Sequence, residues 1–216
     1  MKNHIPIELP TLNRVNVDGK RLYETPNGNR YPSVTTITSL GSEESINQWR
    51  KRVGEVEANK ISKRASDRGT RIHLLCEDYL NNKDLMVDLF DKELWNKFKP
   101  KLKDIDNVYC LESMLYSHKL ELAGTTDCVA EYKGTLSVID FKTSGKLKKK
   151  EWITNYFIQC AFYGYMLWEM TGILAEQLVI LIAVDNEDPQ VFVESIKDWM
   201  PEALKVRQLF RDAKGF

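Results

Sequence analysis

Residues 123–144 read AGTTDCVAEYKGTLSVIDFKTS, and they hold two β-rich runs, TTDCVAEY and TLSVIDFKT, that are separated only by Lys133 and Gly134. A two-residue connection of this kind predicts a β-hairpin whose register is fixed by the turn. Counting outward from the turn, Asp127 lies directly opposite Asp140 on one face, with Cβ atoms about 4.5–5.5 Å apart. Two like charges in this position destabilise a hairpin unless another group compensates them.

Lys142 and a divalent cation are the two candidates for that compensation. Lys142 follows Asp140 by two residues, so its side chain projects from the same face of the strand. A hard cation bound by carboxylate oxygens also converts the repulsion into coordination. The string VIDFK is apolar enough for a central strand, where ionisable groups are costly unless they are paired or bound to metal. Two alternatives stay open: a surface charge cluster at a strand edge, and a longer or bulged turn that shifts the register.

The remaining sequence predicts a continuous succession of helices and strands around this hairpin. A first hairpin is expected within residues 20–38, with Asn27-Gly28-Asn29 as its turn. Helices are expected from Ser42 or Ser45 to Arg52, at 55–80 and at 89–103, followed by three β-rich runs at 108–116, 125–132 and 135–143, a helix at 151–170, strands at 177–185 and 190–196, and a helix at 198–213. This order predicts an α/β fold with a mixed central β-sheet flanked by helices.

Length and composition fit a single globular domain at 1–216. The chain has 216 residues, of which 43% are hydrophobic. We expect residues 20–104 to form a hairpin and helical cover, and residues 105–216 to form the core. The longest apolar runs, such as Leu178–Val184, are far too short to span a bilayer, and the N-terminus has no apolar signal region. The chain is therefore expected to act without a membrane. A monomer is one possibility, and no motif encodes the oligomeric state.

Charge and cysteine content narrow the classes of function. The formal net charge is zero, so any contact with nucleic acid must use local basic patches. Two such patches are present, although each taken alone is better explained as a solvated helix face or loop: Lys60, Lys63, Arg64, Arg68 and Arg71, and Lys146, Lys148, Lys149 and Lys150. The four cysteines, Cys76, Cys110, Cys128 and Cys160, form no C-x-x-C pair, so they predict neither a zinc ribbon nor a disulfide framework and are typical of small buried apolar residues.

Five ordered elements resemble a known family. They are His73 in RGTRIH, Gly124 with Asp127, Asp140 with Lys142, Gln159 with Tyr163, and the string YPSVTTI at 31–37. This pattern resembles the RecB-like branch of the PD-(D/E)xK nuclease superfamily, and within it the mitochondrial genome maintenance exonucleases and related phage exonucleases. The resemblance extends from about Tyr31 to Tyr163, and it implies a restriction-endonuclease-like core. Some RecB-like members hold an iron–sulfur cluster, but no cysteine follows Cys160 here, so no cluster is expected.

The resemblance implies a metal site with Mg²⁺ or Mn²⁺ as cofactor. Asp127 and Asp140 correspond to catalytic carboxylates that bind the metal, and the backbone carbonyl of Phe141 and the side chain of His73 complete its ligands. A core histidine is the alternative for His73, and Glu77, one helical turn later, is either its orienting partner or an ordinary neighbour. Glu112 is a candidate ligand for a second metal, with a structural carboxylate as the alternative.

The resemblance also implies contacts with the substrate. Lys142 is expected to position or activate the attacking water and to neutralise charge in the phosphoryl transition state. Gln159 and Tyr163 share a helix face from which they can bind the scissile phosphate, with a core aromatic as the alternative for Tyr163. Thr143 is a further candidate for phosphate binding, although turn formation explains it equally.

The function expected on these grounds is hydrolysis of DNA from the ends of single strands. A structure-selective endonuclease and a catalytically silent nucleic-acid-binding module are the alternatives. Trp49, Tyr79 and Trp95 in the helical cover can stack on bases or belong to the helix core. No basic, Ser-rich presequence precedes the core, which favours a phage-encoded or bacterial protein in the cytoplasm over an imported mitochondrial one.

Overall fold

The structure, a computed structural model, describes residues 1–17, 20–39 and 43–214, so Ser42, one of the two expected helix caps, lies outside the described residues. Within these residues the strands are β1 (Asn13–Val17), β2 (Lys20–Glu24), β3 (Arg30–Pro32), β4 (Ile105–Ser117), β5 (Leu122–Tyr132), β6 (Thr135–Ser144), β7 (Gln177–Val184) and β8 (Gln190–Ser195). The α-helices are α1 (Val34–Thr38), α2 (Glu43–Val53), α3 (Glu55–Leu80), α4 (Lys92–Phe98), α5 (Thr154–Thr171) and α6 (Ile196–Lys214), and the short 3₁₀ helices are η1 (Lys99–Asp104) and η2 (Lys150–Trp152).

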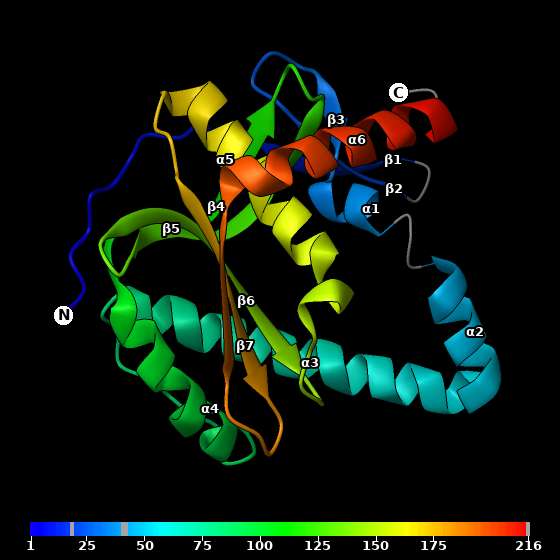
Figure 1. Cartoon of the computed structure of the whole chain (residues 1–216), viewed down its shortest axis with the longest axis vertical. Coiled ribbons are helices and arrows are strands. Elements are labelled where there is room, and N and C mark those ends of the chain that lie inside the picture. Colours follow the sequence, from blue (N-terminus) through cyan, green and yellow to red (C-terminus); the bar gives the residue numbers. More distant parts are fainter. Residues whose placement is uncertain (18–19, 40–42, 215–216) are drawn as a thin grey trace.

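The central sheet is mixed, as the sequence predicts. Among the described residues its strand order is β4-β5-β6-β7-β8. Strands β4, β5 and β6 form the expected antiparallel meander, α5 carries the chain across to β7, which runs parallel to β6, and β8 returns antiparallel to β7. Helices α5 and α6 cover one face, and α3 and α4 cover the other (Figure 1). The fold is therefore an α/β sandwich of helices around one mixed sheet.

Side chains alternate between the two faces of the sheet. Val138 of β6 packs with α5 and α6, whereas its neighbour Ile139 packs with α3 and α4. By the same alternation Asp140 and Lys142 project toward α5, where Gln159 donates to Asp140. The run Leu178–Val184 is buried throughout, because β7 is central and covered on both faces. The cysteines are free, with Cys76, Cys128 and Cys160 buried and Cys110 partly buried.

The hairpin formed by β5 and β6 has the predicted register. Cys128 pairs with Ile139, as a two-residue turn requires. Lys133 and Gly134 both have positive φ, 52° and 81°, which is the geometry that two-residue hairpin turns favour because its twist matches that of the strands. Within the described residues the pairing ends at Cys128 and Ile139, one step before the two aspartates. The alternative of a longer or bulged turn is thus excluded.

The first hairpin differs from the sequence prediction in its second half. The expected run RYPSVTTI forms strand β3 only as far as Pro32, and Val34–Thr38 is helix α1. Ser33 caps this helix, because its side-chain oxygen accepts a hydrogen bond of 3.1 Å from the Thr36 N–H. Val34 and Ile37 are both fully buried, so packing outweighs the strand preference of β-branched residues.

Other differences concern boundaries and one additional strand. The helix expected at 89–103 is divided into α4 and η1, because Pro100 stands at the start of η1, where it has no N–H to donate. The helix expected at 151–170 begins only at Thr154, after η2. Strand β1 extends the N-terminal hairpin to three strands within the described residues. Its run NRVNV has two apolar residues, which is a weak strand signal.

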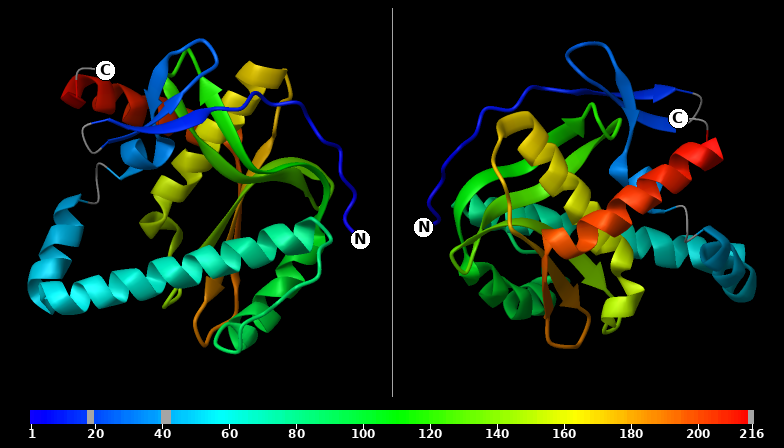
Figure 2. Two further views of the ribbon diagram at one scale, coloured as in Figure 1. Left: turned by 180° about the vertical axis from the view of Figure 1, so that it is seen from behind. Right: turned by 45° about the horizontal axis from the view of Figure 1, so that its top comes forward.

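Helices α2 and α3 form a projecting arm (Figures 1 and 2). Helix α3 has 26 residues and is about 39 Å long. Its C-terminal half packs on the sheet through Ile72, Leu75 and Cys76, whereas residues 55–67 are exposed except for Ala58. A helix segment that is polar around nearly its whole circumference is suited to solvent and not to a core. The arm therefore presents a solvent-exposed helical surface beside the sheet.

Candidate active site

The site begins where strands β5 and β6 separate. Beyond the last backbone pair, a side chain of β5 bonds to the backbone of β6. The Asp127 Oδ2 accepts a hydrogen bond of 2.8 Å from the Phe141 N–H. Asp127 is thus fixed at the gap between the strands, with 12% of its side chain exposed. The register places the two aspartates at the same level of the hairpin, but each carboxylate has its own set of neighbours.

Asp127 belongs to a cluster with His73 of α3 and Glu112 of β4. One ligand atom from each residue lies within 4.8 Å of the others. His73 Nδ1 is 3.5 Å from Asp127 Oδ2 and 3.9 Å from Glu112 Oε1. Burial acts to lower the pKa of His73, but the interaction with Glu112 and the charges of Asp127 and Asp140 raise it above its usual value. The cluster is therefore a concentration of negative charge that favours a cation.

Glu112 reaches this cluster through an unusual backbone conformation. Its φ is +44°, a left-handed value that costs a non-glycine residue about 1–2 kcal/mol. The pairing of β4 with β5 also shifts register on either side of Val108, and such bulges redirect side chains. Strain of this kind persists only where the surrounding structure maintains it, and it concentrates at functional sites.

Asp140 forms a second network with Lys142 and Gln159. Lys142 Nζ lies 2.6 Å from Asp140 Oδ1 and 2.5 Å from Oδ2, and Gln159 Nε2 of α5 donates to Oδ1 at 3.1 Å. Burial raises the pKa of Asp140 to about 6, although the Lys142 ammonium acts in the opposite direction. Burial alone would lower the pKa of Lys142, but Asp140 and Asp127 raise it above its usual value. Lys142 is thus held as a partly buried cation, with 21% of its side chain exposed.

The donor set of these two groups fits a divalent metal. Asp140 Oδ2 is buried and accepts no hydrogen bond in the described part of the chain, although Lys142 Nζ is close to it. A buried carboxylate is costly unless a cation faces it, and the Lys142 ammonium, 2.5 Å from Oδ2, does so in this structure. Carboxylate and carbonyl oxygens are ligands that suit hard cations such as Mg²⁺ and Mn²⁺, and an imidazole is a ligand typical of transition metals.

Gly124 and Tyr163 are brought together as a packing pair. Tyr163 is 2% exposed, and a Cβ atom added at Gly124 would lie 2.8 Å from its hydroxyl oxygen. Because only glycine leaves room for the phenol, these two residues fix α5 against β5. Tyr163 is thus a core aromatic in this structure. Thr143 is partly buried, and its Oγ1 lies 3.8 Å from the Cβ position of Gly69 on α3.

Several residues near the site have no signal in the expected motifs. The Lys142 ammonium lies 5.0 Å from the ring centroid of Tyr156, which stands three residues before Gln159 and so on the same side of α5. That spacing is the signal that could have identified it. Arg68 of α3 forms an ion pair with Asp185 at the end of β7, which ties α3 to the sheet.

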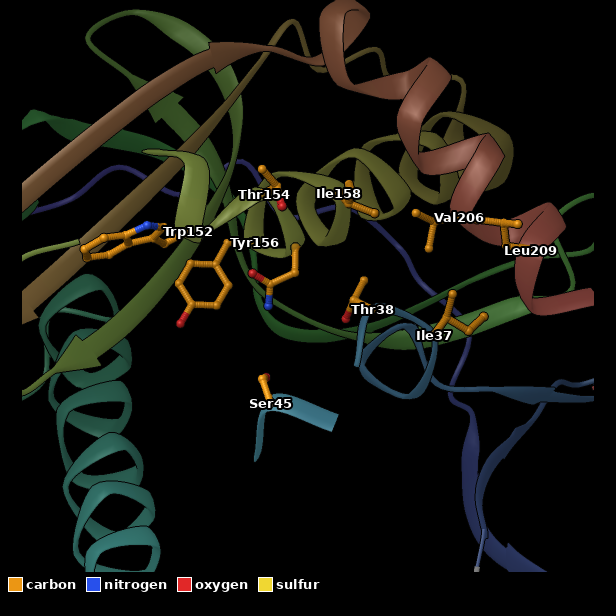
Figure 3. Close-up of a pocket in the computed structure, with 10 residues that line it drawn as sticks. Ile37, Thr38, Ser45, Trp152, Thr154, Tyr156, Ile158, Val206 and Leu209 are labelled. Atoms are coloured by element: carbon orange, nitrogen blue, oxygen red, sulfur yellow. The ribbon is translucent and has the colours of Figure 1, made fainter. Parts of the chain in front are cut away.

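Two cavities adjoin the site. One of about 520 Å³ is lined by His73, Glu112 and Glu77, so Glu77 faces the same space as the histidine one helical turn before it. The other, of about 510 Å³, is lined by Tyr156, Trp152 and residues of α1, α2 and α6 (Figure 3). The members of the first basic patch differ in their surroundings. Lys60, Lys63 and Arg64 are exposed on the arm, where Lys63 pairs with Asp67 of the same helix, whereas Arg68 and Arg71 pair with Asp185 and Asp91.

Of the three aromatic residues expected in the helical cover, Trp95 belongs to the core. It is 2% exposed and packs among residues of α3 and η1, so it is excluded as a stacking surface. Trp49 and Tyr79 are partly buried. Tyr79 is flanked by the ammonium groups of Lys2 and Lys99, 5.7 Å and 5.5 Å from its ring centroid.

None of the helices in the described residues is long and apolar enough to cross a membrane.

The fold and the two networks agree with the family that the sequence resembles. The model of the PD-(D/E)XK nuclease superfamily matches residues 83–213. The chain therefore belongs to this superfamily. The match includes Asp127, Asp140, Lys142 and Gln159, whereas His73 precedes it.

Its curated relatives are called mitochondrial genome maintenance exonuclease 1. The human protein is 30% identical over 146 residues, covering 62% of this chain and 40% of the relative. The protein of Xenopus tropicalis is 33% identical over 132 residues, covering 54% and 37%, and that of Mus musculus is 30% identical over 131 residues, covering 56% and 39%. The chain thus matches less than half the length of each relative. Their names refer to mitochondria, which does not favour the expected host cytoplasm.

Proposed function

We propose that this protein is a Mg²⁺- or Mn²⁺-dependent exonuclease that hydrolyses DNA from the ends of single strands. The observation that carries the proposal is the meeting of two networks at the gap between β5 and β6. His73, Glu112 and Asp127 form one, and Asp140 and Lys142 with Gln159 form the other. Membership of the PD-(D/E)XK nuclease superfamily and the exonuclease names of the relatives support it.

The residues that would hold the metal are Asp127, Asp140, His73 and the backbone carbonyl of Phe141. Glu112, which lies in the cluster with His73 and Asp127, is the candidate for a second metal or for a further ligand of the first. When bound, such a cation polarises a phosphoryl oxygen and lowers the pKa of a bound water. Phosphodiesters need this because they are anionic and repel hydroxide.

Lys142 supplies the fixed positive charge of the site. Its ammonium has three donors, and its contact with Asp140 and the ring of Tyr156 limits where it can point. Held in this way, it can place the attacking water and donate to the phosphoryl oxygens as negative charge develops on them. Gln159 acts through Asp140, because its Nε2 donates to Oδ1.

The remaining expected substrate residues have unequal access to the phosphate. Thr143 directly follows Lys142 and is partly buried, so it can donate a hydrogen bond to a phosphate at the rim. Tyr163 acts by packing against Gly124, which positions the helix that carries Gln159.

The preference for single strands rests on the arm formed by α2 and α3. Lys60, Lys63 and Arg64 are exposed there and can contact the phosphates of an approaching strand. A strand without a partner can bend between this arm and the sheet, whereas a duplex is stiff and about twice as wide, with a persistence length of about 50 nm.

Digestion of end-labelled linear and circular single-stranded DNA with Mg²⁺ tests the proposal. Lys142→Ala and Asp140→Asn are compared with Lys97→Ala, a partly buried lysine of α4 that pairs with Glu93. We expect cleavage of the linear substrate, its loss in both site variants, and full activity in the control. Cleavage of circles would replace the proposal by an endonuclease, and binding without metal-dependent cleavage would leave a nucleic-acid-binding module.

A further inference from the structure

Trp152 and Tyr156 frame a cavity that the proposed chemistry does not use. The cavity has a volume of about 510 Å³, within the range of sites that hold small ligands. Trp152 and Tyr156 lie at one end, Ile37 and Thr38 of α1 lie across from them, and α6 contributes at the other end (Figure 3). The indole of Trp152 is large and apolar, yet 57% of this residue is exposed. An exposed aromatic wall beside an active site is a candidate for ligand stacking.

The cavity adjoins the reacting centre through Tyr156. The Lys142 ammonium lies 5.0 Å from the centroid of the Tyr156 ring, and Tyr156 also lines the cavity. A molecule in the cavity is therefore separated by one side chain from the group that is expected to bind the scissile phosphate. A nucleotide next to that phosphate has the right reach for its base to enter the cavity.

Charge at the mouth of the cavity suits a phosphodiester strand. The ammonium groups of Lys149 and Lys146 lie 5.3 Å and 6.0 Å from the Trp152 ring centroid. They can neutralise the phosphates that flank a stacked base. Thr38, Thr154 and Asn155 add hydroxyl and amide groups to an otherwise apolar lining, and such groups can bond to the edge of a base.

We propose that this cavity receives one unpaired nucleobase of the substrate strand, stacked on Trp152 with Tyr156 as the inner wall. The inference rests on the proposed function, since it deepens the same site. A base that is paired in a duplex cannot enter without leaving its partner, so the cavity contributes to selection of single strands. Stacking on an aromatic ring tolerates every base, because all four have a π-face. The cavity therefore selects strandedness and not sequence.

Binding of fluorescently labelled single-stranded DNA in EDTA tests the subsite without cleavage. Native protein is compared with Trp152→Ala and Trp152→Phe, and with Trp168→Ala as the matched control. Trp168 is also exposed, at 41%, and also has a lysine, Lys119, 5.3 Å from its ring, but it lies near the C-terminal end of α5. We expect Trp152→Ala to weaken binding by about tenfold, Trp152→Phe to retain most of it, and the control to match the native protein.

A series of strands with one abasic nucleotide at successive positions gives the second readout. Native protein should lose about tenfold in affinity at one position in the series, and Trp152→Ala should show no such position. Equal behaviour of the Trp152→Ala and Trp168→Ala variants, or no abasic effect in the native protein, would overturn the subsite. If linear DNA is still cleaved and Lys142→Ala abolishes cleavage, the proposed function survives that result. Absence of both binding and cleavage would overturn both proposals.

Discussion

Substitution of Gly124 by alanine tests how the site is supported. The added Cβ would lie 2.8 Å from Tyr163 Oη, 3.0 Å from Cε1 and 3.3 Å from Cζ. The phenol has little freedom to retreat, because Tyr163 is 2% exposed and sits in the core with its neighbours on α5. Overpacking of this kind costs about 1–3 kcal/mol. We expect the free energy of unfolding in urea to fall by this amount.

A double-mutant cycle identifies the contact that causes the loss. Tyr163→Phe removes the oxygen nearest to the added methyl group and leaves the ring carbons at 3.0 Å and 3.3 Å. The double variant should therefore recover part of the stability lost in Gly124→Ala, with a coupling of about 0.5–2 kcal/mol. Strictly additive effects, with no recovery, would refute the reasoning.

Gly69 provides the opposite control. It lies inside α3, and a Cβ there meets only Thr143 Oγ1, at 3.8 Å. Gly69→Ala should stabilise the protein by up to about 1 kcal/mol, because alanine is the better helix former. A loss of stability in Gly69→Ala similar to that in Gly124→Ala would mean that loss of glycine, and not contact with Tyr163, is responsible.

Three further predictions concern the ion pairs and the metal. Arg71→Ala leaves Asp91, which is 3% exposed, without its ion-pair partner. We expect the free energy of unfolding in urea to fall by about 2–4 kcal/mol. An unchanged urea midpoint of unfolding would contradict this prediction. Glu112→Gly relieves the φ of +44° and should raise stability by about 1 kcal/mol while weakening Mn²⁺ affinity in calorimetry; unchanged affinity would remove Glu112 from the ligands. Chelation with EDTA should abolish cleavage, and added Mn²⁺ should raise the Tm of the native protein more than that of Asp127→Asn, because only a folded site binds the ion.

Structural features that depend on residues close together in the sequence could mostly be predicted. The register of β5 and β6 was predictable because Lys133 and Gly134 lie between the strands and a two-residue turn fixes the pairing. The long helix α3 was predictable from its period, with bounds that match those expected. Strand preference failed at Val34–Thr38, where Ser33 caps a helix and burial of Val34 and Ile37 decides the conformation.

The composition of the site was predictable only in part. Sequence spacing grouped Asp127, Asp140 and Lys142, and the register of the hairpin up to Cys128 and Ile139 is the one that this grouping assumed. The sequence did not show that the two carboxylates have separate partners. Asp127 lies beside His73 of α3, whereas Asp140 accepts a hydrogen bond from Gln159 of α5. Tyr156 could have been found from its three-residue spacing from Gln159 on α5, whereas Trp152 lies in the short helix η2 and has no such spacing.

The sequence by itself determined the turns, the helix periods, the alternation of the strands and the motif that marks the family, because each depends on residues close together in the chain. Tertiary structure alone decided which distant groups meet at the end of the β5–β6 pairing. Glu112 is the clearest case: its side chain lies with His73 and Asp127, and its backbone is in a left-handed position within β4. That conformation is unfavourable locally, so it exists only because the packed sheet maintains it.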